Sequence, residues 1–103
     1  MKVELLYFSG CANWRVARER LAHALQLTGH TDQRIELVVV VTEEQAQQLR
    51  FPGSPTIRIG GGDLFPRPEQ RPGLSCRLYA TAEGVDGAPS LAQLVEAVGG
   101  ACP

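Results

Sequence analysis

The chain lacks the features that mark several large classes of protein. Its formal net charge is only −1, so there is no electrostatic reason to expect binding to nucleic acid or to an anionic membrane. No apolar run approaches the roughly 18 residues that a membrane-spanning helix needs. A strand-like segment begins at Val3, which leaves no room for a signal peptide, and we therefore expect a cytoplasmic protein.

Cysteine and histidine are also scarce. Three cysteines, Cys11, Cys76 and Cys102, are too few and too scattered for a disulfide framework. In a reducing compartment we expect them to be thiols, unless one of them is catalytic. The two histidines, His23 and His30, are not spaced to form a metal site with Cys11. The sequence therefore predicts neither a metal site nor a bound cofactor.

What the chain does contain is the composition of one soluble globular domain spanning residues 1–103. Hydrophobic residues make up 44% and charged residues 20%, which is ordinary for such a domain. Apolar periodicity and turn residues predict alternating strands and helices. The strands are expected at 3–8, 34–41, 54–59 and 76–80, and the helices at 12–28, 42–49 and 90–98. Two parallel crossovers are thus implied first, followed by a hairpin-joined pair of strands and a covering helix.

The sequences of three of these segments support more specific predictions. The run at 34–41 is almost continuously apolar, as in a strand that is covered on both faces. In the strand at 76–80, Cys76 shares a face with Leu78, so it is interpreted either as a core residue or as a redox partner. The segment at 60–73 is rich in glycine and proline and has no period, which predicts a surface loop or a lid.

The chain is organised around Cys11, which follows an apolar run and a Ser-Gly pair and precedes an amphipathic helix. At this junction the sulfur lies near the unpaired N–H groups of the helix start, which favour the thiolate. Arg15 and Arg18 add positive charge in the following turns. We expect Cys11 to alkylate faster than the other two cysteines, with a pKa below the reference of about 8.5. The alternative is a buried structural cysteine.

Two short motifs resemble the thioredoxin-fold family, and the resemblance covers essentially the whole chain. Residues 8–14, Phe-Ser-Gly-Cys-Ala-Asn-Trp, stand in the place of the family's Cys-x-x-Cys motif. Residues 53–57, Gly-Ser-Pro-Thr-Ile, are similar to the family's cis-proline segment. The resemblance implies an α/β fold, a three-layer sandwich of order β-α-β-α-β-β-α with a mixed four-stranded sheet.

The same resemblance implies a substrate site. A cis peptide bond before Pro55 would turn the Ser54 backbone outward, so that Ser54, Pro55 and Thr56 hold an extended partner chain beside Cys11. Trp14 occupies the position of the family's second cysteine, which leaves a monothiol site. Trp14 itself is interpreted either as a cap on the core or as a surface on which substrate stacks.

The implied activity is thiol–disulfide exchange on protein disulfides or small thiols, as in monothiol glutaredoxins, with glutathione as co-substrate. The adduct on Cys11 would be resolved by glutathione, by Cys76 or by Cys102. Cys76 is the better internal candidate, because the third and fourth strands should pair and bring it toward Pro55.

Two other interpretations stay open. Residues 73–77, Gly-Leu-Ser-Cys-Arg, resemble a segment of small proteins grouped with the organomercurial lyases. That chemistry uses two thiolates and an acid, which here would be Cys11, Cys76 and Asp63. The other interpretation is a non-enzymatic thioredoxin-fold module, in which Cys11 has lost its role and the loop at 60–73 contacts a partner protein.

Overall fold

A computed structural model of the chain describes residues 1–67 and 69–101. Within these residues the strands are β1 (Val3–Tyr7), β2 (Ile35–Val39), β3 (Thr56–Ile59), β4 (Gly62–Asp63), β5 (Tyr79–Thr81) and β6 (Gly84–Asp86). The helices are α1 (Asn13–Leu27), α2 (Glu43–Leu49) and α3 (Leu91–Ala101). None of the helices in this part of the chain is long and apolar enough to cross a bilayer.

Strands β1 to β4 form one mixed sheet in the order β2-β1-β3-β4. β1 runs parallel to β2, as the crossover through α1 predicts, and antiparallel to β3. The second predicted parallel crossover, through α2, is therefore wrong, because the chain turns back after α2 and β3 enters the sheet in the opposite direction. β3 pairs in turn with β4 in an antiparallel hairpin. The predicted α/β class, with a mixed four-stranded sheet and three helices, is therefore confirmed.

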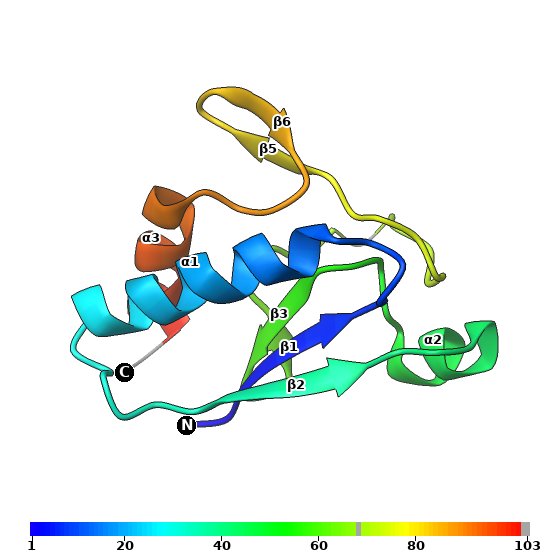
Figure 1. The fold of residues 1–103 in the computed structure, drawn as a ribbon, viewed down its shortest axis with the longest axis horizontal. Coiled ribbons are helices and arrows are strands. Elements are labelled where there is room, and N and C mark those ends of the chain that lie inside the picture. Colours follow the sequence, from blue (N-terminus) through cyan, green and yellow to red (C-terminus); the bar gives the residue numbers. More distant parts are fainter. Residues whose placement is uncertain (68, 102–103) are drawn as a thin grey trace.

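The sheet has apolar packing on both of its faces. Because side chains alternate along β1, Leu5 enters a core with residues of α1 and α3, whereas Leu6 enters a second core with Ala46 of α2 and with Phe51. α1 and α3 lie side by side on the first face (Figure 1). α2 lies beyond the end of β2 (Figure 1). This arrangement places the start of α1, and with it Cys11, just beyond the end of β1.

Local sequence explains the course of the helices. α1 buries Ala17 and Leu21 at helical spacing, as its apolar stripe predicts. α2 begins with a capping box, in which the Thr42 hydroxyl accepts from the Gln45 N–H at 3.1 Å and the Gln45 side chain accepts from the Thr42 N–H at 3.2 Å. The first two predicted helices agree with the structure to within one residue at each end.

The fourth strand was predicted at the wrong position and with the wrong partner. Of the predicted segment, only the residues that begin β5 form a strand, and β5 pairs with β6 and not with β3. The edge of β3 is taken by β4, because Gly60 and Gly61 adopt φ angles of 61° and 85° and turn the chain straight back. Cys76 nevertheless reaches the start of the third strand through an isolated parallel bridge with Ser54.

The prediction that the strand at 34–41 is covered on both faces is also wrong. β2 is an edge strand of the sheet, and its Leu37 and Val39 are exposed. The cores form instead over the central strands, where Leu5 and Ile57 are buried. A continuous apolar run therefore predicted the strand here without revealing its position in the sheet.

Candidate active site

The two cysteines that the sequence singled out are joined by a disulfide bond. Cys11 and Cys76 are 65 positions apart in the chain, and their Cα atoms lie 5.9 Å apart, within the range that a disulfide requires. The predicted internal partner thus lies beside the predicted reactive thiol. Cys102, the other candidate partner, lies outside the described residues.

The turn between β1 and α1 places Cys11. The Cys11 N–H donates to the Phe8 carbonyl at 3.0 Å, and the side-chain amide of Asn13 donates to Cys11 Sγ at 3.6 Å. The N-cap of α1 is Ala12, and no side chain of the described chain caps this helix start. Its first N–H groups, together with the Asn13 amide, are the donors that would stabilise a Cys11 thiolate in the reduced protein. Cys11 itself is only 2% exposed.

The Cys11 sulfur also contacts the backbone of Ser54. Sγ lies 3.8 Å from the Ser54 carbonyl oxygen. A disulfide sulfur carries no proton, so this is a van der Waals contact in the oxidised protein, and the same geometry suits an S–H···O hydrogen bond once Cys11 is a thiol. The Ser54 hydroxyl is buried and has no hydrogen-bond partner among the described residues.

The backbone of Ser54 holds the segment that carries the second cysteine. The Ser54-Pro55 peptide bond is cis. The Ser54 N–H donates to the Ser75 carbonyl at 2.7 Å, and the Ser54 carbonyl accepts from the Arg77 N–H at 2.8 Å. Ser54, Pro55 and Thr56, which were predicted to bind substrate, are all buried. The chain's own residues occupy the backbone groups where a partner chain was expected.

Arg77 is the residue of this region that sequence reasoning did not single out. It is fully buried. Its guanidinium donates to the Asp63 carboxylate at 2.8 Å and to the Thr56 hydroxyl at 3.1 Å. It also donates to the Phe65 carbonyl and lies 4.8 Å from the centre of the Tyr79 ring. These contacts fix the chain directly after the second cysteine.

The side chains of this segment alternate as predicted, but the apolar side faces outward. Cys76 and Leu78 lie on the same side, and Leu78 is 56% exposed, whereas Arg77 between them is 0% exposed. Burial of the arginine is possible because Asp63 on β4 compensates its charge. The available signal was an aspartate directly after three glycines, where a tight hairpin returns a carboxylate alongside β3.

Tyr79 attaches the same segment at a second point. Its hydroxyl donates to the Pro55 carbonyl, and its ring packs edge-on against Phe65 with the centroids 5.6 Å apart. Burial raises the pKa of Tyr79 well above its ordinary value, opposed by the charge of Arg77. The phenol therefore keeps its proton and remains a donor. Arg77 and Tyr79 together hold the chain beyond Cys76 by contacts that do not involve the disulfide.

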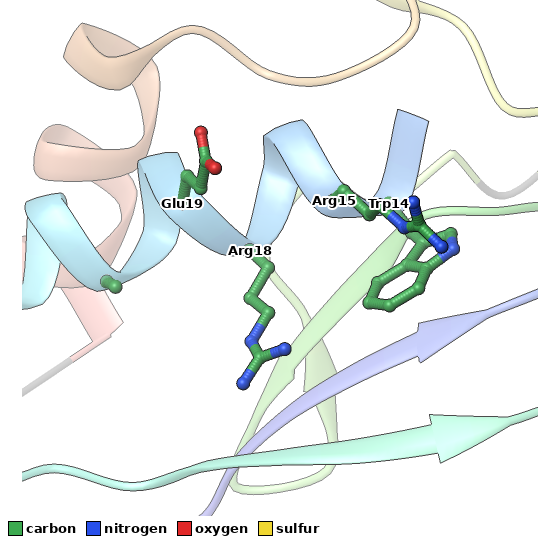
Figure 2. A pocket seen from close by; sticks show the side chains of 5 residues that line it. Trp14, Arg15, Arg18 and Glu19 are labelled. Atoms are coloured by element: carbon green, nitrogen blue, oxygen red, sulfur yellow. The ribbon is translucent and has the colours of Figure 1, made fainter. Parts of the chain in front are cut away.

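Trp14 packs on the core, as the first of its two interpretations predicts, and nothing tests the second, a surface on which substrate stacks. Its ring stacks on Tyr7 with the centroids 4.3 Å apart, and it packs against the core between the sheet and α1. The Arg15 guanidinium lies 5.4 Å from the centre of the same ring. Trp14, Arg15 and Arg18 of α1 line a pocket on this side of the helix (Figure 2). Neither cysteine of the disulfide lines that pocket, so we assign it no part in the thiol chemistry.

Asp63, the third residue of the organomercurial alternative, is engaged with other groups. One carboxylate oxygen accepts from Arg77 and the other from the Phe65 N–H, each at 2.8 Å. Because successive side chains of extended chain point to opposite sides, buried Arg77 and its carboxylate partner lie on the side away from exposed Cys76. Among residues 1–67 and 69–101, no group of three or more His, Cys, Asp or Glu side chains is placed to hold a metal ion.

The segment at 60–73, predicted to be a loop without a strand, contains the short strand β4, and its later residues attach to the chain between α2 and β3. The Gly73 N–H donates to the Phe51 carbonyl at 3.0 Å, and the Gln70 side chain donates to the Pro52 carbonyl. The loop is therefore attached to the segment that leads into the cis-proline strand.

Comparison of the chain with protein-family models, with curated proteins and with solved structures finds no match. The interpretation of the site consequently depends on its own geometry. That geometry is a buried sulfur at a helix start, bonded to an exposed cysteine whose neighbours are held by the backbone of Ser54.

Proposed function

We propose that the protein is a thioredoxin-like thiol–disulfide exchange protein that acts through Cys11 and Cys76 on protein disulfides or small thiols, with glutathione as co-substrate. The observation that carries the proposal is the Cys11–Cys76 bond at the start of α1. The mixed sheet, with β3 antiparallel to β1, supports the thioredoxin-like part of the proposal. The proline-opened strand that contacts the Cys11 sulfur supports it as well.

The exchange needs only the two sulfurs and a partner. In the reduced protein one cysteine attacks a partner disulfide, forms a mixed disulfide and releases the first partner thiol. The other cysteine then attacks the mixed disulfide, closes the Cys11–Cys76 bond and releases the second thiol. Two electrons pass from the protein to the partner, and the two cysteine protons end on the two released thiols.

Two features favour exchange over a purely structural bond. Cys76 is exposed, so a thiolate from solution can reach the bond. The chain beyond Cys76 is held by the side chains of Arg77 and Tyr79, so opening the bond does not require unfolding. In a cytoplasmic protein, which is also part of the proposal, a disulfide is expected as a transient state of a catalytic or sensing cycle.

Turnover of a glutathionylated peptide tests the proposal. Release of the peptide thiol in excess glutathione is followed with catalytic amounts of the wild type and of three Cys→Ser variants. We expect Cys102→Ser, the matched control, to keep the wild-type rate, and Cys11→Ser and Cys76→Ser to fall at least about tenfold. Full activity of Cys76→Ser contradicts the paired mechanism, because Cys11 would then act with glutathione alone. Full activity of Cys11→Ser contradicts the paired mechanism in the same way, because Cys76 would then act with glutathione alone. A wild-type protein that does not accelerate the reaction above glutathione alone contradicts the function itself.

A further inference from the structure

We infer that Cys76 is the sulfur that exchanges with the partner, and that Cys11 is the internal sulfur that leaves and later re-forms the bond. The inference rests on the proposed function and adds the order of its steps. It reverses the expectation from the sequence, in which the Cys11 thiolate meets the substrate. The reason is that the two sulfurs have unequal surroundings.

Exposure to solvent differs between the two cysteines. A thiolate must approach the attacked sulfur in line with the bond that breaks, so the rate depends on which sulfur is open to solvent. Cys11 is 2% exposed, and its sulfur contacts the Asn13 amide at 3.6 Å and the Ser54 carbonyl at 3.8 Å. Cys76 is exposed, on the same side as exposed Leu78. A partner therefore reaches Cys76 first.

The stability of the departing thiolate favours the same order. When a thiolate attacks Cys76, the electron pair of the broken bond goes to Cys11, and a thiol whose thiolate is stabilised leaves faster. That charge forms at the start of α1, where the first turn contains no acidic residue. The Asn13 amide donates to this sulfur, and the positive end of the α1 dipole lies beside it.

Cys76 stays within reach of Cys11 while it carries the partner. The hydrogen bonds from Ser54 to Ser75 and from Arg77 to Ser54, at 2.7 and 2.8 Å, flank Cys76 and do not involve its sulfur. The buried guanidinium of Arg77 keeps the same segment in place. The Cys11 thiolate can therefore attack the Cys76 sulfur again as an intramolecular reaction, at high effective concentration.

The steps balance in both directions. A partner thiolate attacks Cys76, forms a partner–Cys76 disulfide and releases Cys11 as a thiolate. A second partner thiolate attacks the partner sulfur of that adduct, forms a partner disulfide and releases Cys76. The protein disulfide is reduced, two partner thiols are oxidised, and their two protons pass to the two cysteines. In reverse, Cys76 attacks a partner disulfide and Cys11 closes the bond.

The position of the trapped adduct tests this order. The Cys102→Ser protein, oxidised at Cys11 and Cys76, is mixed with reduced glutathione, stopped in acid after short times and digested with pepsin in acid, so that exchange cannot continue. We expect glutathione on the peptide that contains Cys76, with a free thiol at Cys11, in at least about tenfold excess over the opposite arrangement. Equal amounts, or an excess on Cys11, would overturn the order.

A second measurement decides the question where the adduct is too short-lived to collect. Asn13→Ala removes the amide that donates to Cys11. If Cys11 leaves, glutathione should reduce the variant roughly two- to tenfold more slowly, the effect of one net hydrogen bond. If glutathione attacks Cys11 instead, the smaller side chain at position 13 exposes that cysteine, and the variant should be reduced at an equal or faster rate. That result would overturn the inference. Ser9→Ala, an exposed position in the same turn, is the matched control and should keep the wild-type rate.

Failure of the proposed function gives a different result from failure of this order. If the bond is structural only, glutathione does not reduce it in the folded protein, whichever residue stands at position 13. If glutathione is found on Cys11, the two cysteines still exchange with the partner, and only the conclusion that Cys76 is the attacked sulfur is wrong.

Discussion

Opening the Cys11–Cys76 bond should lower the free energy of unfolding by about 4 kcal/mol near room temperature, because it releases the unfolded chain from a constraint. The bond closes a loop across 65 positions. For a loop of that length, the chain-entropy relation gives a loss of about 14 cal/mol/K in the entropy of the unfolded chain. In a chain of 103 residues, the corresponding fall in the melting temperature is roughly 20 °C.

The folded state itself should change little when the bond opens. The two backbone hydrogen bonds of Ser54 to the residues that flank Cys76 remain, and so does the buried pair between Arg77 and Asp63. The Tyr79 hydroxyl also keeps its acceptor on Pro55. The loss of stability should therefore come from the unfolded ensemble and not from lost native contacts.

Urea unfolding of three forms measures this effect. The Cys102→Ser protein is compared when oxidised, when reduced, and with both Cys11 and Cys76 replaced by serine. We expect the second and third forms to be equally stable and the oxidised form to exceed both. A difference below about 1 kcal/mol would refute the reasoning. Loss of hydrogen-exchange protection at the Arg77 amide on reduction would refute it as well, since the segment would then detach.

Three substitutions test other parts of the structure. Arg77→Met should lower the free energy of unfolding in urea by about 3 kcal/mol, because it leaves a largely buried carboxylate without its partner; a loss no larger than that of the exposed Arg67→Met, less than about 0.5 kcal/mol, would contradict this. Gly87→Ala would place a Cβ 2.1 Å from Asn13 Nδ2 and push the amide off the sulfur. Glutathione should then reduce the bond roughly two- to tenfold more slowly, and an unchanged rate would count against the role of Asn13. Thr42→Ala removes the α2 cap and should lower the free energy of unfolding in urea by about 1 kcal/mol. The rate at which glutathione reduces the Cys11–Cys76 bond should not change, and a slower rate would mean that α2 influences the two cysteines.

Periodicity and turn residues were sufficient to predict the elements that carry Cys11. The apolar spacing of Ala17 and Leu21 identified α1, and the apolar run before Ser9 identified β1. The junction between them follows from chain order alone. The nearness of Cys76 was predicted from pairing of the third and fourth strands, which the structure does not contain; Cys76 reaches this place through an isolated bridge with Ser54 instead.

The sequence could not reveal which side of the Cys76 segment is buried. Alternation with a period of two determines which residues share a side, but not which side faces the core. Burial of Arg77 depends on Asp63, which lies 14 positions earlier and reaches it through the β3–β4 hairpin. The two-residue strand β4 is too short to have a pattern of its own. A charge pair between distant positions thus accounts for the exposure of Cys76, on which the proposed order of exchange depends.

The fraction of protein with a closed Cys11–Cys76 bond, across a series of reduced-to-oxidised glutathione ratios, tests the exchange function most directly. Folded protein is equilibrated at each ratio from the oxidised and from the reduced form, stopped in acid and analysed by mass spectrometry. We predict that both starting forms give the same two-electron curve, with the bond opening as reduced glutathione increases. A bond that stays closed in the folded protein at every ratio, or two cysteines that never link, would contradict the proposed function.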